Sequence, residues 1–172
     1  GQVSEIVIEA TGKDVVLFKT SMGRIANLTL RQLGTEKFCC VDIAQGRLEM
    51  EECDVTSQSL ACVAIHGGAD PRLRRNRIHD GKGSGVVVLG HGRGTIEDNE
   101  IFGHAGPGVA ITERANPTLR RNRIRDGKGS GILVAQAGQG TLEDNEIFGN
   151  KSAGVAITNG ANPTLRRNRI HD

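Results

Sequence analysis

The stretch that decides the fold is LRRNRI at residues 119–124, which returns with opposite charge as LEDNEI at residues 142–147. A repeat of roughly 20–50 residues is typical of a solenoid, in which each repeat forms one turn and stacks on the next. Five blocks of this kind carry an asparagine at the same place, and these asparagines lie 23 residues apart: Asn76, Asn99, Asn122, Asn145 and Asn168.

One repeat predicts the structure of one turn. Residues 140–162 read GTLEDNEIFGNKSAGVAITNGAN, with apolar residues alternating over short runs. Alternation with period two predicts short strands, and no window keeps a helical period. Glycines between the runs predict corners, where positive φ is often needed. We therefore predict an all-β, single-chain parallel β-helix of about six to seven coils of 22–25 residues, in which equivalent strands pair at about 4.8 Å.

The repeat also sets the boundaries that we predict. The solenoid covers residues 25–172 and is regular from about residue 71, whereas residues 1–24 lose the pattern and are expected to form an irregular coil or cap. Residues 50–55 align with the first block, which places Cys53 in the asparagine row. The sequence stops in mid-coil at Asp172, so we expect the parent protein to continue with an acidic coil. An open sheet edge there predicts end-to-end self-association.

The asparagine row has a structural explanation. Asparagine tolerates left-handed backbone and carries both an amide donor and a carbonyl acceptor. Side chains stacked one per coil can bond to one another and to the backbone of a bend. We therefore predict an inward-facing asparagine ladder with no catalytic role.

Charge alternates in sign from one block to the next. In stacked coils Arg121 is expected between Asp98 and Asp144, about 4.8 Å from each coil. Exposed pairs contribute roughly 0.2–1 kcal/mol each and disfavour a slip by one coil, which would stack like charges. Since the charges compensate one another, we do not expect nucleic acid as a partner. The outward residues of this charge ladder are Glu51, Glu52, Asp54, Arg74, Arg75, Arg77, Glu97, Asp98, Glu100, Arg120, Arg121, Arg123, Glu143, Asp144, Glu146, Arg166, Arg167 and Arg169.

Another outward row follows the isoleucines and consists of His79, Phe102, Arg125, Phe148 and His171. An arginine between two phenylalanine rings predicts cation–π contacts of about 0.5–1 kcal/mol. Because this row is exposed and mixes rings with cations, we predict that it is the binding stripe. The alternative is a capping ladder that only stabilises the outer face.

Composition narrows the function classes. The 172 residues carry 22 basic and 20 acidic side chains, a balance that favours neither membranes nor nucleic acid. No apolar run approaches the roughly 18 residues of a membrane-spanning helix, and no signal peptide is recognisable. Four cysteines without a C-x-x-C pair favour a cytoplasmic location. An extracellular location after removal of an export signal is the alternative. We predict neither a cofactor nor a metal.

The repeat resembles a known family. NPTLRRNRI at residues 116–124, followed by DG and in the next coil by LEDNEIF, is similar to the right-handed parallel β-helix repeats of the pectate-lyase-like superfamily. Within that superfamily it resembles carbohydrate-binding and sugar-hydrolase repeats, notably those of β-helical F-box substrate adaptors and their bacterial relatives. The resemblance is strong over residues 72–172 and weaker over residues 25–70.

The resemblance implies a right-handed solenoid and two kinds of function. The enzymes of the superfamily are polysaccharide lyases, hydrolases and epimerases, which act from a groove with clustered aspartates and sometimes calcium. Here the acidic residues repeat regularly beside arginines, and tryptophan and tyrosine, which offer sugars an apolar face, are missing. The adaptors bind protein along the solenoid wall, although this sequence contains no F-box segment.

We therefore predict a non-catalytic recognition or scaffold module that binds a protein partner along one solenoid face. The alternative is a polysaccharide-active or carbohydrate-binding β-helix. A structural subunit that stacks end to end is the third interpretation. The residues for sugar chemistry would lie at two glycine-rich corners, roughly 9–10 Å apart, which is wide for one concerted site. They are Asp80, His79, Lys82, Asp126 and Lys128.

Overall fold

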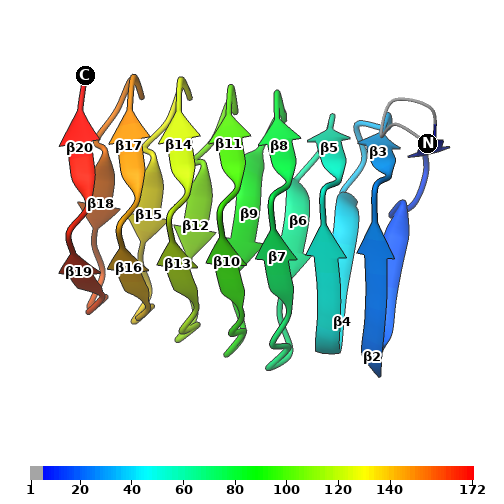
Figure 1. Cartoon of the computed structure of the whole chain (residues 1–172), viewed down its shortest axis with the longest axis horizontal. Helices are drawn as coiled ribbons and strands as arrows, with labels where there is room; N and C mark the ends of the chain where they lie inside the picture. The colour runs from blue at the N-terminus through cyan, green and yellow to red at the C-terminus, as the bar shows by residue number, and fades with distance from the viewer. Residues whose placement is uncertain (1–5) are drawn as a thin grey trace.

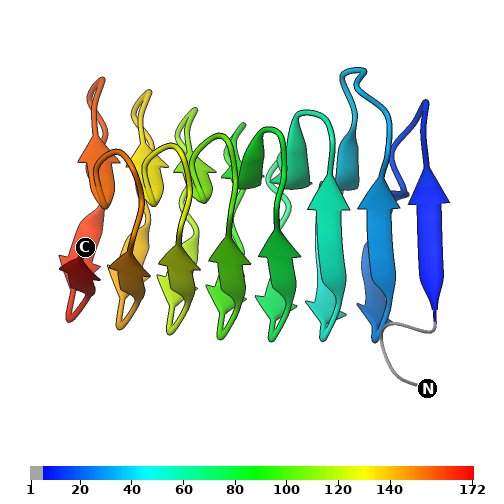
Figure 2. The same cartoon turned by 90° about the horizontal axis from the view of Figure 1, so that it is seen from above.

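The computed structural model describes residues 6–172, which contain twenty β-strands and no helix. Successive turns stack along one axis, from the N-terminal strands to β20 (Arg169–His171), as Figure 1 and, from above, Figure 2 show. The strands pair in parallel with their equivalents in neighbouring turns, for example Leu119 with Ile96 and with Leu142. The chain is a parallel β-solenoid of about seven turns, as the repeat predicts.

Each regular turn has three strands, and each strand contributes to one side of the solenoid. The first side contains β7 (Arg72–Arg74), β10 (Thr95–Glu97), β13 (Thr118–Arg120), β16 (Thr141–Glu143) and β19 (Thr164–Arg166). The second side is an eight-stranded sheet of β1 (Val7–Ala10), β3 (Thr29–Gln32), β5 (Asp54–Ser57), β8 (Arg77–His79), β11 (Glu100–Phe102), β14 (Arg123–Arg125), β17 (Glu146–Phe148) and β20. The third side contains β6 (Ala61–Ile65), β9 (Ser84–Val88), β12 (Val109–Ile111), β15 (Ile132–Val134) and β18 (Val155–Ile157).

Two long strands belong to more than one side. β4 (Cys39–Glu51) pairs with β6 of the third side through its first half and with β7 of the first side through its second half. β2 (Val16–Ala26) follows β4 with two register shifts. The first and third sides are therefore joined into one twelve-stranded sheet. β1 and β2 lie mostly within the segment predicted to be irregular, of which residues 1–5 are outside the described part.

The corner between the first side and the eight-stranded sheet is made by a charged residue. Arg75, Asp98 and Arg121 have φ of 54°, 56° and 53°, whereas the asparagine that follows each of them does not have positive φ. The tolerance of asparagine for left-handed backbone is therefore not used at this corner. Its neighbour makes the bend, and the asparagine contributes its side chain.

Those side chains form the predicted inward ladder. Asn122 Nδ2 donates to the Ile96 carbonyl at 2.8 Å and to Asn145 Oδ1 at 3.0 Å. Asn122 Oδ1 accepts from the backbone and side-chain amides of Asn99, both at 3.1 Å. The same contacts recur one turn away, and Cys53 occupies the asparagine position in its own turn, donating its backbone N–H to Asn76. Each bend thus satisfies its buried polar groups through the next coil.

A second kind of inward-facing polar side chain was not predicted. His104 Nδ1 accepts the Gly81 N–H at 3.1 Å, and its Nε2 lies 3.0 Å from the Ile78 carbonyl oxygen. Asn150, two turns further on, makes the equivalent contacts with the Gly127 N–H and the Ile124 carbonyl. These bonds require neutral His104 with its proton on Nε2. Burial, the main cause, lowers the pKa of His104 to about 4.

The core consists of stacked aliphatic rows rather than aromatic rings. Leu119, Ile124 and Val134 are fully buried, and each continues a row from turn to turn. Space is so limited that a Cβ on Gly131 would lie 2.5 Å from Ile147 Cγ2, so glycine is required there. Burial of aliphatic surface at about 25 cal/mol per Å² supplies the driving force that aromatic residues supply elsewhere.

Candidate recognition face

The outer surface of the eight-stranded sheet carries two parallel rows of side chains. In each regular strand the central isoleucine points into the core, and the residues on either side point outward. The preceding positions form a row that we call the charge row, and the following positions form one that we call the ring row. The charge row is Asp54, Arg77, Glu100, Arg123, Glu146 and Arg169, and the ring row is His79, Phe102, Arg125, Phe148 and His171.

The ring row is stacked in two groups, His79–Phe102–Arg125 and Phe148–His171. The rings of His79 and Phe102 lie 5.0 Å apart at 8°, and those of Phe148 and His171 lie 5.0 Å apart at 2°. The Arg125 guanidinium lies 4.4 Å from the centre of the Phe102 ring. These contacts follow from strict registration, because equivalent residues are brought face to face at the spacing of neighbouring strands.

One contact in this row differs from the prediction that Arg125 lies between two phenylalanine rings. Arg125 lies over Phe102 but makes no comparable contact with Phe148, which is covered instead by Arg123 at 5.4 Å. The reason is that Arg125 is held by carboxylates, at 2.7 Å from Asp126 and 3.6 Å from Glu100. The row is also less exposed than expected, with 16% of the His79 side chain and 25% of the Arg125 side chain accessible.

The charge ladder pairs mostly in one direction. Most of its arginines bond to a carboxylate of the preceding coil. Arg123 bonds in both directions, to Glu100 of the preceding coil and to Glu146 of the following coil. Arg121 binds Asp98 at 2.9 Å and Glu97 at 3.2 Å, but makes no such contact with Asp144, on the other side. The other backward pairs are Arg74–Glu51, Arg75–Glu52, Arg77–Asp54, Arg120–Glu97, Arg166–Glu143 and Arg167–Asp144.

Two of the acidic residues expected on the surface are buried. Glu97 is 1% exposed and Glu51 is 8% exposed, because guanidinium groups from several coils close over each carboxylate. Glu97 contacts Arg72 at 2.6 Å as well as Arg120 and Arg121. Burial favours its neutral form, but hydrogen bonds from Arg120 and Arg72 outweigh burial and lower its pKa. The hydrogen bond from Arg167 likewise lowers the pKa of Asp144.

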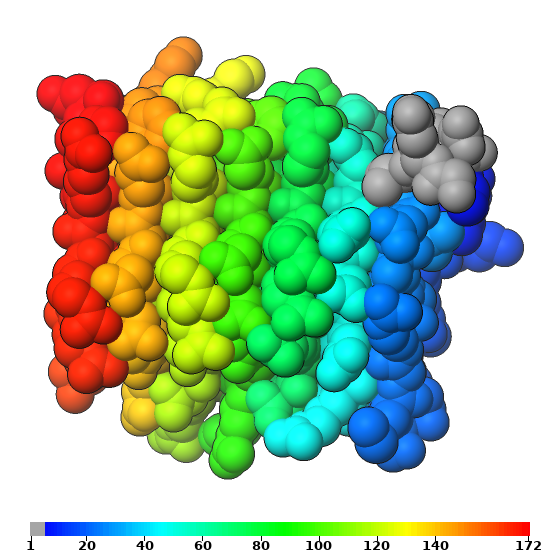
Figure 3. Space-filling model, viewed as in Figure 1, coloured from blue at the N-terminus to red at the C-terminus, as the bar shows by residue number. Residues whose placement is uncertain are grey.

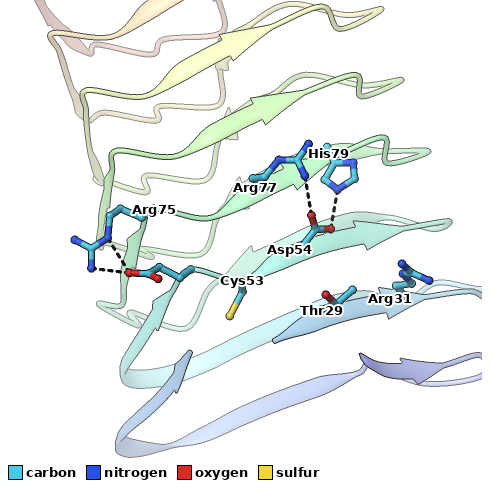
Figure 4. Close-up of a pocket in the computed structure, with 8 residues that line it drawn as sticks. Thr29, Arg31, Cys53, Asp54, Arg75, Arg77 and His79 are labelled. Atoms are coloured by element: carbon cyan, nitrogen blue, oxygen red, sulfur yellow. Dashed lines mark hydrogen bonds and ion pairs between the residues drawn. The ribbon is translucent and has the colours of Figure 1, made fainter. Parts of the chain in front are cut away.

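A groove of about 550 Å³ opens at the N-terminal part of this face, over β3, β5 and β8. It forms because Thr29 and Asp54 are short, whereas Arg31, Arg77 and His79 around them are long. Figure 4 shows the Asp54 carboxylate turned toward Arg77 and His79, with Arg31 on the opposite side. Sequence reasoning missed this groove. Its signal is the break in alternation at Thr29, which stands where an arginine would continue the charge row.

The residues named for sugar chemistry are divided between two turns. His79 Nδ1 lies 2.8 Å from Asp80 Oδ2, and His79 Nε2 lies 2.7 Å from Asp54 Oδ1. Asp126 is bound instead by Arg125 at 2.7 Å. Within residues 6–172 neither Lys82 nor Lys128 makes an ion pair, and two turns separate them, roughly 10 Å at the ordinary strand spacing.

These features define the class of protein: a parallel β-helix whose turns are stacked one on the next, visible as successive bands of colour in Figure 3. A family model described as a right handed beta helix region matches residues 14–170. The chain therefore belongs to the right-handed β-helix family, which confirms the predicted fold. Comparisons with curated proteins and with solved structures give no match. The narrower resemblance to F-box adaptors has no support in these comparisons.

Two further findings concern the described residues. Across residues 6–172, no three His, Cys, Asp or Glu side chains are grouped so that they could hold a metal ion. The same residues contain no helix long and apolar enough to cross a membrane.

Proposed function

We propose that this β-helix is a non-catalytic recognition module that binds a protein partner along the outer face of the eight-stranded sheet. The observation that carries the proposal is the ring row, in which aromatic rings and a guanidinium are stacked in fixed positions beside paired charges. Aromatic residues and arginine are enriched at the energetically important centres of protein interfaces.

Preorganisation supports this use of the face. His79 is held by Asp54 and Asp80, and Arg125 is held by Asp126 and Phe102. Side chains that are already ordered lose little conformational entropy when a partner binds. The charge row beside them alternates in sign, so it disfavours partners of uniform charge and favours a partner with its own pattern.

The polysaccharide alternative has one observation in its favour, which is the polar groove with His79 between two carboxylates. Both ring nitrogens of His79 are engaged there, and the second aspartate–lysine pair lies two turns away. General acid–base catalysis needs groups within hydrogen-bond reach of one substrate atom. The arrangement therefore fits binding better than cleavage.

The test compares two triple variants. Phe102→Ala, Arg125→Ala and Phe148→Ala together remove the ring row, whereas Thr95→Ala, Thr118→Ala and Thr141→Ala remove three stacked outward residues of the first side. Proteins captured by the wild type would be identified, purified and titrated by calorimetry. We expect the ring-row variant to bind the partner at least tenfold more weakly and the threonine variant to bind within twofold of the wild type.

Equal binding by the wild type and the ring-row variant would overturn the proposed site. A parallel screen against polyuronates and neutral glycans tests the alternative. Cleavage of a glycan, or glycan binding that the ring-row variant loses while no protein binds, would assign the face to polysaccharide. Circular dichroism of both variants verifies that the solenoid is intact.

A further inference from the structure

We infer that the groove over β3, β5 and β8 binds an acidic side chain of the partner, held between Arg31 and Arg77. This inference rests on the proposed function, because it names the chemistry of the segment that the recognition face accepts. The groove adjoins the ring row through His79, so one bound segment can contact both.

Arg31 differs from most arginines of the charge ladder. Those arginines bond to a carboxylate of a neighbouring coil at about 3 Å, for example Arg121 to Asp98 at 2.9 Å. Within the described residues, the carboxylate nearest to Arg31 belongs to Glu9 at 3.9 Å, and about half of each of these two side chains is exposed. On its other side Arg31 is paired in register with Thr56, which carries no charge. Arg31 therefore retains guanidinium donors that face the groove.

Arg77 borders the groove from the opposite side. Its side chain is 59% exposed, and one terminal nitrogen bonds to Asp54 Oδ2 at 3.2 Å. Asp54 does not oppose an incoming anion strongly, because its oxygens are turned toward Arg77 and His79 and it is only 22% exposed. Guanidinium groups bind carboxylates through pairs of N–H donors, which Arg77 and Arg31 both retain.

The balance of charge favours an anion. Three guanidinium groups line the groove, those of Arg31, Arg75 and Arg77, against the two carboxylates of Glu52 and Asp54. A volume of about 550 Å³ is in the range of about 300–1,000 Å³ typical of small-ligand sites and accommodates one or two side chains. Arg31 and Arg77 come from strands two turns apart, roughly 10 Å along the solenoid, so a carboxylate between them is within reach of both long side chains.

The position beside the ring row favours a peptide over an isolated anion. A segment whose acidic side chain enters the groove has its next residues over His79 and Phe102, whose rings are stacked 5.0 Å apart. We therefore expect an acidic residue followed by apolar or aromatic residues. An oligouronate has no such apolar continuation and is the competing anion in the test.

The experiment uses fluorescein-labelled peptides of alternating Glu and Phe, with the matched Gln–Phe peptide as the neutral control and an oligogalacturonate as the competing class. Binding is followed by fluorescence anisotropy at 50 and 300 mM salt. The protein variants are Arg31→Ala and, as a matched control, Arg47→Ala, which removes the same charge from an exposed pair with Asp70 outside the groove.

We expect the Glu peptide to bind at least tenfold more tightly than the Gln peptide, and more weakly at high salt because exposed charges are screened. Arg31→Ala should weaken it about threefold to fivefold, the upper part of the range of a single exposed ion pair, while Arg47→Ala changes it less than twofold. Equal binding of both peptides, an unchanged affinity of Arg31→Ala, or binding of the oligogalacturonate alone would overturn the inference.

The inference and the proposed function fail separately. If the ring-row variant loses the protein partner while Arg31→Ala retains both partner and peptide, the recognition face stands and the acidic-segment inference is wrong. If neither variant affects partner binding, the face itself is wrong.

Discussion

Replacing His104 with asparagine should remove an acid-sensitive element from the core. Asn150 occupies the equivalent place two turns away and bonds to the same kind of backbone groups, so asparagine at position 104 can accept the Gly81 N–H and donate to the Ile78 carbonyl. The exchange keeps both hydrogen bonds and removes only the titratable ring. It is therefore a close test of what neutral His104 contributes.

The size of the expected change in stability follows from the difference between the pKa of His104 in the folded protein and in the unfolded chain. In the unfolded chain His104 takes up a proton near its ordinary pKa of 6.5, whereas in the folded protein it does so only near pH 4. Between these values the unfolded state binds more protons, so the free energy of unfolding falls as the pH drops from about 6.5 to about 4. A difference of about 2.5 in pKa corresponds to a loss of about 3 kcal/mol. Below pH 4 this contribution is constant.

Urea denaturation at pH 7.0, 5.5 and 4.0 measures the effect. The wild type should lose about 3 kcal/mol more than His104→Asn over this range, because the carboxylates titrate in both proteins and cancel in the comparison. Parallel pH profiles for the two proteins would refute the reasoning. His104→Leu serves as a contrast, since it leaves the buried Gly81 N–H unpaired and should cost about 1–3 kcal/mol at every pH.

Two other predictions concern the ladders. Asn122→Ala removes hydrogen bonds to both neighbouring coils and should lower the free energy of unfolding by about 3 kcal/mol. Asn168→Ala, in the partly exposed last coil, should lower it by less than about half as much. Denaturant midpoints compare the two variants, and equal losses would contradict the ladder. Glu97→Gln leaves three guanidinium groups around a neutral amide and should lower the free energy of unfolding by about 3 kcal/mol. Glu143, whose side chain is 16% exposed, contacts only Arg166 and Arg167, so Glu143→Gln should lower it by about 1 kcal/mol. Thermal unfolding at fixed pH measures both variants, and a larger effect at Glu143 would contradict the argument from burial.

The sequence alone determined the architecture of this chain. Identical spacing of the asparagine blocks predicts both the parallel solenoid and the pairing of each block with the next, because a repeat that buries its apolar face only by stacking has one efficient arrangement. The inward asparagine ladder and the order of neighbours within the ring row follow from the same register. The sequence also predicted the cation–π contact between Phe102 and Arg125.

Other features depended on local geometry that the repeat does not encode. Left-handed backbone at Arg121 rather than Asn122 came from the structure, as did the backward reach of most arginines that buries Glu97. Each arginine has a carboxylate in the preceding coil and another in the following coil, so the periodic sequence does not favour either partner. The backbone bend decides which carboxylate lies closer and therefore which way the side chain turns.

In the candidate site, too, some features could be predicted from the repeat and others came only from the structure. Residues of the ring row were identifiable because they share one position in every repeat. The groove was not, because it arises where Thr29 and Asp54 are short beside Arg31 and Arg77, that is, where the periodicity fails. His104 and Asn150 differ in type and were recognised as equivalent only because they bond to corresponding backbone groups two turns apart. Periodic sequence thus determines the register of the coils, whereas tertiary packing decides which side chains are buried, paired or left facing a cavity, because these depend on volumes and distances between coils.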